Sequence, residues 1–419
     1  MVQEIPIAWQ IKPLSEIAKI KGGKRVPKGE KLVFENTGFP YIRVADFSDD
    51  GTINLDNIRY VPEFAHEQIK SYTIDSVDLY ISIAGTIGKA GIVPKVLSGA
   101  NLTENACKLV LNKCAFNKYV YYFTQTDYFV EQAGLNTRVA AMPKLALSRL
   151  GTIKLPFPPI PEQKRIVDIL DQAFADIEQA RAKTEQNLRN ARELFESYLQ
   201  QVFSQRGEGW TESELFDHVK FIDYRGKTPK KTESGLRLIT AKNVRMGFLK
   251  PDPQEFVSPD SYDTWMTRGV PLKGDILFTT EAPLANVAQL DTDEKVVFAQ
   301  RIITMQPDRS VINSGFLKYL LMSQPIQKKI HEKGTGATAT GIKASLLKKI
   351  SINYPSCLRE QKRWVDTLDG LTESVNELEQ IYSMKLNALD ELKKSILHLA
   401  FTGQLTHSEK PAEAKGAAA

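Results

Sequence analysis

Apolar residues recur every three or four positions along two long segments of the chain, 162–206 and 360–405. This spacing predicts two α-helices whose apolar edges form heptad seams, as in a coiled coil. Prolines precede the first segment and a glycine follows each seam, as suits helix starts and stops. The predicted seam residues are Ile166, Leu170, Ile177, Leu188 and Phe195 in the first helix and Leu368, Leu371, Val375, Leu378, Leu389, Leu392 and Ile396 in the second.

The two predicted helices begin with nearly identical decapeptides, EQKRIVDILD at 162–171 and EQKRWVDTLD at 360–369. The register holds without a gap as far as Phe203 and Phe401. A repeat of such long period indicates two similar halves. Because the second helix must bury its own seam, we expect it to run antiparallel to the first. The matched stretch of about 42 residues predicts a rod of roughly 63 Å.

Short strand and helix patterns alternate ahead of the first long helix. Apolar runs at 41–44, 79–83 and 102–112 predict strands, and 118–132 predicts an aromatic helix. Such a mixture of short elements predicts an α+β domain.

The segment between the two long helices repeats this programme. YIRVADF at 41–47 corresponds to LITAKNV at 238–244, and the helical stretch 116–129 matches 316–330. We therefore predict an α+β protein in which two similar globular domains are separated by two long antiparallel coiled-coil helices, related by a pseudo-twofold repeat. Its expected parts are a first domain at 1–155, a first helix at 156–206, a second domain at 207–354, a second helix at 355–405 and a disordered tail at 406–419.

The net charge of +5 is unevenly distributed along the chain. The two long helices carry −1 and −3 and the tail is neutral, so the two globular regions hold +9. A basic excess of this kind indicates a polyanionic partner for the globular regions, and the helices are expected to bind protein. Chance asymmetry is the alternative explanation.

Composition narrows the class of protein. No stretch approaches the roughly 20 apolar residues that a membrane span needs, and the N-terminal segment lacks the pattern of a secretory signal. The three cysteines show no CxxC spacing, which favours a reducing cytoplasm. The five histidines are dispersed without metal-ligand spacing, so we expect no metal site. No GxSxG, HExxH or GxxxxGK(S/T) motif appears, so we expect no catalytic residue.

Two segments resemble catalytic or nucleotide sites only loosely. Asp252 with Asp293 and Lys295 could suggest a metal-dependent nuclease, but charged turn residues are the simpler explanation. The segment GTGATATG at 334–341 follows a helix and lacks the Lys-Ser/Thr ending of an ATP loop. It is either a plain linker or a loop that offers Thr335 and Thr338 to a nucleic-acid phosphate.

Basic loops recur at matching places in the two halves. Lysine and arginine on such loops contact DNA phosphates, whereas Arg, Asn and Gln side chains also read base edges. Any one of these residues could equally be a solvated surface group, so the evidence lies in the recurrence of the set. The candidates are Lys21, Lys24, Arg25, Arg43, Asn101, Asn105 and Arg138 in the first half and Arg225, Lys227, Thr228, Lys230, Lys231, Lys242, Asn243, Arg245, Gln300 and Arg301 in the second.

The segment PPIPEQKRIVDIL, the second EQKR helix and the order domain, helix, domain, helix together resemble a DNA-specificity subunit of a type I restriction-modification system. The second helix departs from the family pattern at Ser356 and Arg359, where paired prolines are usual. The resemblance covers roughly residues 5–405.

This resemblance implies a non-catalytic subunit whose two target-recognition domains each read one half of a split double-stranded DNA sequence. It implies partners as well: two adenine methyltransferase subunits and the motor-nuclease restriction subunits. S-adenosylmethionine, ATP and Mg²⁺ would belong to those partners, so we expect no cofactor in this chain. A coiled-coil scaffold without DNA recognition is the main alternative, and a stand-alone nuclease or methyltransferase is a third.

Overall fold

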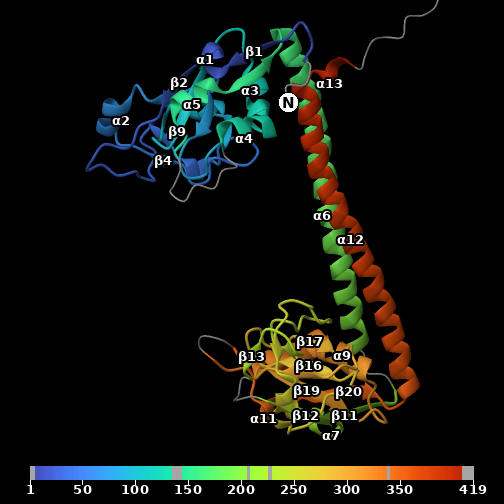
Figure 1. The fold of residues 1–419 in the computed structure, drawn as a ribbon. Helices are drawn as coiled ribbons and strands as arrows, with labels where there is room; N and C mark the ends of the chain where they lie inside the picture. Colours follow the sequence, from blue (N-terminus) through green and yellow to red (C-terminus); the bar gives the residue numbers. More distant parts are fainter. Residues whose placement is uncertain (1–4, 135–143, 205–207, 225–228, 337–339, 408–419) are drawn as a thin grey trace, which may run out of the picture. The chain divides into compact units, whose positions relative to one another are not determined.

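The chain divides into two compact units in the computed structural model (Figure 1). Unit 1 comprises Met1–Thr184 and Met384–Ala419, and unit 2 comprises Glu185–Ser383. The boundary crosses two long helices, α6 (Ile160–Ser204) and α12 (Leu358–Phe401), so each unit holds one globular domain and one segment of each helix. The structure describes residues 5–134, 144–204, 208–224, 229–336 and 340–407.

Domain 1 lies in unit 1 and contains two four-stranded sheets of order β2-β9-β6-β7 and β4-β3-β8-β5, with a separate β1-β10 pair. Among the strands that the structure describes in this domain, β3 and β8 are the pair that runs parallel. Its elements are β1 (Gln10–Pro13), α1 (Leu14–Ile17), β2 (Ala18–Gly22), β3 (Pro40–Ile42), β4 (Arg59–Tyr60), α2 (Glu63–Ile69), β5 (Thr73–Ile74), β6 (Leu79–Ser82), β7 (Ala90–Ile92), β8 (Ala100–Leu102), β9 (Ala106–Leu111), α3 (Asn117–Thr124), α4 (Asp127–Ala133), α5 (Leu147–Thr152) and β10 (Lys154–Phe157).

Domain 2 lies in unit 2 and repeats this plan with sheets β12-β19-β16-β17 and β13-β15-β14-β18 and a β11-β20 pair. Its parallel pair, β14 with β18, matches β3 with β8. Its elements are β11 (Trp210–Glu214), α7 (Leu215–His218), β12 (Val219–Asp223), β13 (Lys231–Thr232), β14 (Leu236–Ile239), β15 (Phe256–Val257), α8 (Tyr262–Trp265), β16 (Ile276–Thr279), β17 (Val287–Gln289), β18 (Val296–Phe298), β19 (Ile302–Pro307), α9 (Ser314–Met322), α10 (Gln324–Glu332), α11 (Ala344–Lys348) and β20 (Ser351–Pro355).

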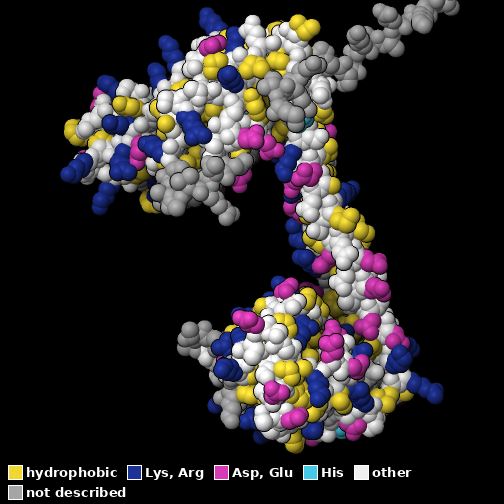
Figure 2. All heavy atoms as spheres, viewed as in Figure 1, with side chains coloured by type: hydrophobic (Ala, Val, Ile, Leu, Met, Phe, Trp, Pro, Cys, Tyr) yellow, Lys and Arg dark blue, Asp and Glu magenta, His cyan; other side chains and the backbone are white. Residues whose placement is uncertain are grey.

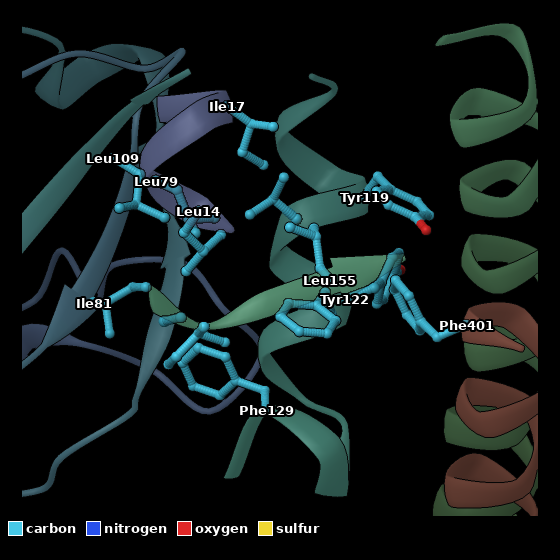
Figure 3. Packing of buried hydrophobic residues seen from close by; sticks show 14 of the residues in the cluster. Leu14, Ile17, Leu79, Ile81, Leu109, Tyr119, Tyr122, Phe129, Leu155 and Phe401 are labelled. Atoms are coloured by element: carbon cyan, nitrogen blue, oxygen red, sulfur yellow. The ribbon is translucent and has the colours of Figure 1, made fainter. Parts of the chain in front are cut away.

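The core of domain 1 continues into the long helices. Leu79 and Leu109 from the central sheet are fully buried in the same cluster as Tyr119 on α3 (Figure 3). Phe401, in the last turn of α12, packs against this cluster with its ring 5.0 Å from that of Tyr119. The domain therefore shares one hydrophobic core with the helix ends in its unit.

The predicted α+β class is confirmed, but two predicted elements are divided. The helix expected at 118–132 is two helices, α3 and α4, because the Thr126 side chain accepts the N–H of Phe129 and caps a new helix. The strand expected at 102–112 is likewise divided into the end of β8 and the whole of β9. A local polar cap overrides the apolar pattern in the first case.

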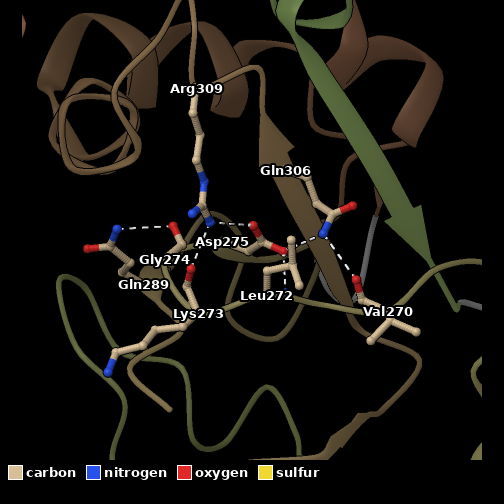
Figure 4. A network of polar contacts seen from close by, with 8 residues as sticks. All are labelled: Val270, Leu272, Lys273, Gly274, Asp275, Gln289, Gln306 and Arg309. Carbon is tan, nitrogen blue, oxygen red and sulfur yellow. Dashed lines mark hydrogen bonds and ion pairs between the residues drawn. The ribbon is translucent and has the colours of Figure 1, made fainter. Parts of the chain in front are cut away.

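A buried aspartate begins the central strand of each domain. Asp275 accepts hydrogen bonds from the Leu272 N–H and the Gln306 side chain, and Arg309 lies 3.4 Å away (Figure 4). Its counterpart Asp78 is also buried and forms an ion pair of 3.0 Å with Lys108. The same carboxylate thus ties the same strands in both domains, through different partners.

The helices α6 and α12 pair antiparallel within each unit. In unit 1, Arg181 forms an ion pair with Asp390, and Lys393 lies 3.7 Å from Glu178. In unit 2, Arg192 bonds Glu379 at 2.6 Å, and Leu199 packs with Leu368. In both units the residue number rises on one helix as it falls on the other, which confirms the expected antiparallel pairing.

Most of the predicted seam is confirmed. Five of its residues are less than a tenth exposed, and Leu188, Phe195, Leu371, Leu389 and Ile396 are half-buried. The fully buried members are Ile166, Leu170, Ile177, Leu368 and Val375.

Two seam assignments on α12 are wrong. Leu378 is 37% exposed and Leu392 is 47% exposed. Four residues after Val375, Leu389 and Ile396, the side chains of Glu379, Lys393 and Ala400 are more buried than those three residues after them. A straight helix has 3.6 residues per turn, so a strict seven-residue repeat drifts around its surface. Lys393, four positions after Leu389, accordingly lies over the ring of Phe174 on α6.

Candidate nucleic-acid interface

Three loops meet at the end of the central strand β6 in domain 1. The N–H groups of Ile83 and Ala84 donate to the carbonyl of Asn105, and Leu145 donates to the carbonyl of Ile83. We call the described residues 83–85, 103–105 and 144–145, together with the adjoining loop at 23–25, loop edge 1. Four segments distant in sequence therefore present their side chains together.

Domain 2 forms the matching loop edge 2 from residues 280–282, 299–301 and 334–342 with its gap. The Thr280 N–H donates to the carbonyl of Arg301, and Ile342 donates to the carbonyl of Thr280. Thr335 and Gly341 exchange two backbone hydrogen bonds, so these two described residues of the GTGATATG segment lie side by side. The backbone framework is the same as in loop edge 1.

Three predicted DNA contacts come together at loop edge 1. Arg25 is largely exposed and bonds Glu104 through Nε at 2.7 Å, and Lys24 lies 5.6 Å from the ring centre of Tyr72. Burial alone would raise the pKa of Glu104, but the Arg25 hydrogen bond and the neighbouring donors lower it below its usual value. Asn105 is half-buried beside this ion pair.

Loop edge 2 also carries an arginine–glutamate pair. Arg301 Nε lies 2.8 Å from Glu281 Oε1, and both side chains are close to half exposed. Gln300 is half-buried and Thr335 is exposed. Both glutamates are functional candidates that the sequence reasoning missed, and they stand at different places, since Glu104 follows β8 whereas Glu281 follows β16, the counterpart of β6.

Other predicted contacts lie beyond the loop edges. Lys21 is exposed on β2, opposite Lys108, and lines a cavity of about 260 Å³ with Tyr72 and Thr73. Figure 2 shows lysine and arginine side chains spread over the visible face of domain 1. In domain 2, Lys230 and Lys242 are exposed, Lys231 pairs with Glu255 at 2.7 Å and Arg245 is half-buried.

The structure contradicts three base-reading assignments. Asn101 is 1% exposed, and its side chain donates to the carbonyl of Ile69. Asn243 is fully buried and holds its own turn through hydrogen bonds with Thr240 and Lys250. These amides have no free edge to offer a base.

Arg43 is the third of these residues. Its guanidinium makes two bonds to Asp46 and a third to the carbonyl of Asn57. The Arg43 guanidinium therefore uses its donors on groups within its own domain. Five further candidates lie outside the described residues, namely Arg138, Arg225, Lys227, Thr228 and Thr338.

Among the residues that the structure describes, no group of three or more His, Cys, Asp or Glu is placed to hold a metal ion. Asp293, from the loose nuclease-like pattern, lies 3.2 Å from Lys273 on the surface. None of the described helices is long and apolar enough to cross a membrane.

The repeated decapeptide joins each domain to the helix that leaves it. In unit 1 the fully buried Gln163 donates through Nε2 to the carbonyls of Cys114, at 3.0 Å, and Pro158, at 2.8 Å. Its Oε1 accepts the N–H of Phe116 at 2.8 Å. One amide thus satisfies three backbone groups at the start of α3 and α6.

Gln361 makes the same three bonds in unit 2. Its Nε2 donates to the carbonyls of Val311 and Pro355, and its Oε1 accepts the N–H of Asn313. Asn313 is therefore the counterpart of Phe116, and the sequence match of 116–129 to 316–330 is wrong by three residues. The aromatic residues of the two segments had suggested an alignment of Phe116 with Phe316, which the hydrogen bonds do not support.

An aspartate eight residues further along each helix makes a second attachment. In unit 1, Asp171 accepts the Tyr122 hydroxyl at 2.5 Å and pairs with Lys118 at 2.6 Å. Tyr122 is buried with its ring edge-on to Phe174. Burial, reinforced by the hydrogen bond to Asp171, raises the pKa of the phenol, so it remains a proton donor at neutral pH.

Unit 2 reproduces this attachment with Asp369. It accepts the Tyr319 hydroxyl at 2.5 Å and lies 3.3 Å from Lys318. Tyr319 is buried, which raises its pKa in the same way. We call the two sets, Gln163–Asp171 with Tyr122 and Gln361–Asp369 with Tyr319, joint 1 and joint 2. Their signal in the sequence was the exact return of Gln and Asp in both decapeptides.

The chain contains two similar α+β domains with cationic loops, and each domain is joined to a long antiparallel helix pair. These features define a binding protein with two similar binding domains. The model of the type I restriction modification DNA specificity domain matches residues 6–186 and again 207–387. The chain therefore belongs to the family of type I restriction-modification DNA specificity subunits.

Relatives match nearly the whole chain. The MjaVIII specificity subunit of Methanocaldococcus jannaschii is 24% identical over 96% of this chain and 94% of its own length. The EcoBI specificity subunit of Escherichia coli is 22% identical over 95% of this chain and 86% of its own length.

Solved structures show the same fold. A chain from a study of complex assembly in the type I R-M system superposes with a TM-score of 0.78 at 19% identity, covering 96% of this chain and 100% of its own. The HsdS subunit of Thermoanaerobacter tengcongensis gives 0.60 at 18% identity, covering 96% and 98%.

Proposed function

We propose that this DNA specificity subunit recognises a bipartite, asymmetric target, each domain reading one half on either side of a fixed spacer. The observation that carries the proposal is the pair of loop edges, which share a backbone framework but differ in side chains. Because the two loop backbones are arranged alike, the two domains can approach DNA in the same way. Their different side chains would then recognise different bases. The chain itself is non-catalytic and acts on DNA in the cytoplasm.

Arg25 and Arg301 are the best candidates for base reading. Each stands on a loop edge with its guanidinium partly exposed and held by a glutamate. Arginine reads guanine through two parallel bonds, and glutamate can accept from cytosine. Neither pairing requires a change of backbone, so each Arg–Glu pair can exchange its internal contact for a base contact.

The exposed side of α12 is proposed to receive partner subunits. Leu378 and Ile381, both in unit 2, are 37% and 55% exposed. Their spacing of three residues places them on one helical face. Exposed apolar surface of this kind marks protein interfaces. Two methyltransferase subunits and the restriction subunits would bind, bringing S-adenosylmethionine, ATP and Mg²⁺.

One experiment tests recognition directly. The purified full-length chain is used to select duplexes from a random DNA pool, and the bound DNA is sequenced. We expect two different half-sites at one separation, with binding weakened by salt because phosphate contacts release counterions. A coiled-coil scaffold would select no sequence. Turnover of DNA by the chain alone would instead establish an enzyme.

The spacing is proposed to follow the length of the helix pair. Seven residues inserted at matched places in both α6 and α12 add about 10 Å, or about three base pairs. The selected spacer should lengthen accordingly, whereas an insertion in one helix alone should disrupt the seam. An unchanged spacer in the matched double insertion would refute this ruler.

A third measurement addresses the partners. Replacing Leu378 and Ile381 by Glu should prevent methyltransferase from co-purifying with the chain while leaving DNA selection intact. Replacing Glu373 and Glu377, exposed charges on the same helix, by Gln is the matched control. Retention of methyltransferase by the first variant would move the docking surface elsewhere.

A further inference from the structure

We propose that joints 1 and 2 position the domains, so that Gln163–Asp171 and Gln361–Asp369 set the separation at which the two half-sites are read. The inference rests on the proposed bipartite recognition and adds the residues that determine its spacing. These residues act through the domains that they hold and contact no DNA themselves.

Each joint attaches its domain at two separate points. Gln163 and Asp171 are eight residues apart on α6, a distance of about 12 Å along the helix. A single attachment would allow the domain to pivot about it, whereas two directional attachments prevent that rotation. Hydrogen bonds are strongly directional and fix an orientation more closely than the neighbouring aromatic packing, such as Phe401 on Tyr119.

The joints keep their geometry where the rest of the domains diverges. Both tyrosine hydroxyls lie 2.5 Å from their aspartate. The lysine that supports the aspartate comes from different places, since Lys118 precedes Tyr122 by four residues and Lys318 precedes Tyr319 by one. The contact is therefore maintained even though the residues that supply it have moved.

Small rotations at a joint have large effects at a loop edge. For a domain of about 150 residues, a lever of about 20 Å is of the order of its size. A pivot of about 10° would move the far end by about 3.5 Å, which is about one base-pair step. Loosening a joint should therefore blur the spacer by about one base pair without altering the bases that are read.

The test uses the full-length chain and the random-pool selection, which reports half-sites and spacer together. The variants are Tyr122→Phe, Tyr122→Phe combined with Asp171→Ala, and the matching Tyr319→Phe with Asp369→Ala. Asp168→Ala, an exposed carboxylate one turn from Asp171, is the control. Tyr122→Phe retains the ring against Phe174, so the domain keeps its packing.

We expect wild type and the control to select one spacer. The joint variants should select the same two half-sites, but with discrimination against a spacer one base pair longer or shorter reduced about tenfold, equivalent to ~1.4 kcal/mol. A single undiminished spacer in the double variants overturns the inference. Loss of the first half-site in Tyr122→Phe also overturns the inference. The Tyr122 hydroxyl would then be needed to recognise the bases and not only to position the domain. Absence of any bipartite site for wild type would refute the proposed function instead.

Discussion

Gln163 and Gln361 make the same three hydrogen bonds in their respective units, and Asp171 and Asp369 each accept a buried tyrosine hydroxyl. The loop edges differ from this pattern. They share backbone bonds but present Lys24, Arg25 and Asn105 in one domain and Gln300, Arg301 and Thr335 in the other. Directional attachments tolerate little change, whereas side chains on a fixed backbone can change freely.

The largest difference is expected at the buried aspartates. Lys108→Met should cost about 3–5 kcal/mol because it leaves the charge of Asp78 buried without its cation. Arg309→Met should cost less than about 1 kcal/mol, since Arg309 is half exposed and Asp275 retains the Gln306 and Leu272 bonds. Urea unfolding followed by circular dichroism measures both. Equal losses would show that the two aspartates are held alike.

The seam register gives the next largest effect. Leu368→Ala should destabilise the chain by about 3 kcal/mol because Leu368 is fully buried beside Leu199 and Tyr319. Leu392→Ala should change stability by no more than about 0.5 kcal/mol, as Leu392 is 47% exposed. Thermal unfolding compares them. A similar cost for both would restore the strict heptad register.

Base reading should respond separately in each half. Arg25→Ala should relax one position of the first half-site by about 1–3 kcal/mol, and Arg301→Ala one position of the second. Binding titrations with duplexes substituted at single positions measure this loss. Glu104→Gln should preserve guanine preference if Arg25 is the reader. Uniform weakening at every position would assign the arginines to phosphates.

The smallest effects are expected from lysines outside the loop edges. Lys21→Ala and Lys230→Ala should each weaken binding to all sequences alike and reduce the salt slope by about one. Titration over a range of salt concentrations gives both quantities. Lys70→Ala, an exposed lysine paired with Glu67, is a control for general charge loss. A change confined to one sequence would contradict the phosphate assignment.

Much of the architecture could be predicted from the pattern of residues. The heptad spacing indicated both long helices, and the letter-for-letter return of EQKR indicated two halves. Periodicity and repetition are local properties that survive without knowledge of the fold. The strand at 79–83 was also found, and the strand at 41–44 was found in part, since β3 ends at Ile42 and a 3-10 helix begins at Val44. Short apolar runs bounded by turns can be recognised without knowledge of their distant partners.

The candidate DNA-binding residues were predicted less well, because the type of a residue does not show whether its side chain is exposed. Asn101 and Asn243 looked like base readers, but both are buried and hold their own loops. In the sequence, Arg25 and Arg301 could not be distinguished from the other candidate residues. The structure shows that each forms an ion pair with a glutamate where loops distant in sequence meet.

By itself the sequence determined the duplication, the helix pair and the cationic character of the domains, because each follows from spacing or composition. Only the tertiary structure decided the seam register at Leu378 and Leu392, the alignment of Asn313 with Phe116, and the role of the repeated Gln and Asp. The physical reason is that these depend on contacts between residues distant in sequence, 49 positions between Gln163 and Cys114 and 209 between Arg181 and Asp390. A hydrogen bond between residues distant in sequence produces no periodic pattern from which it could be predicted.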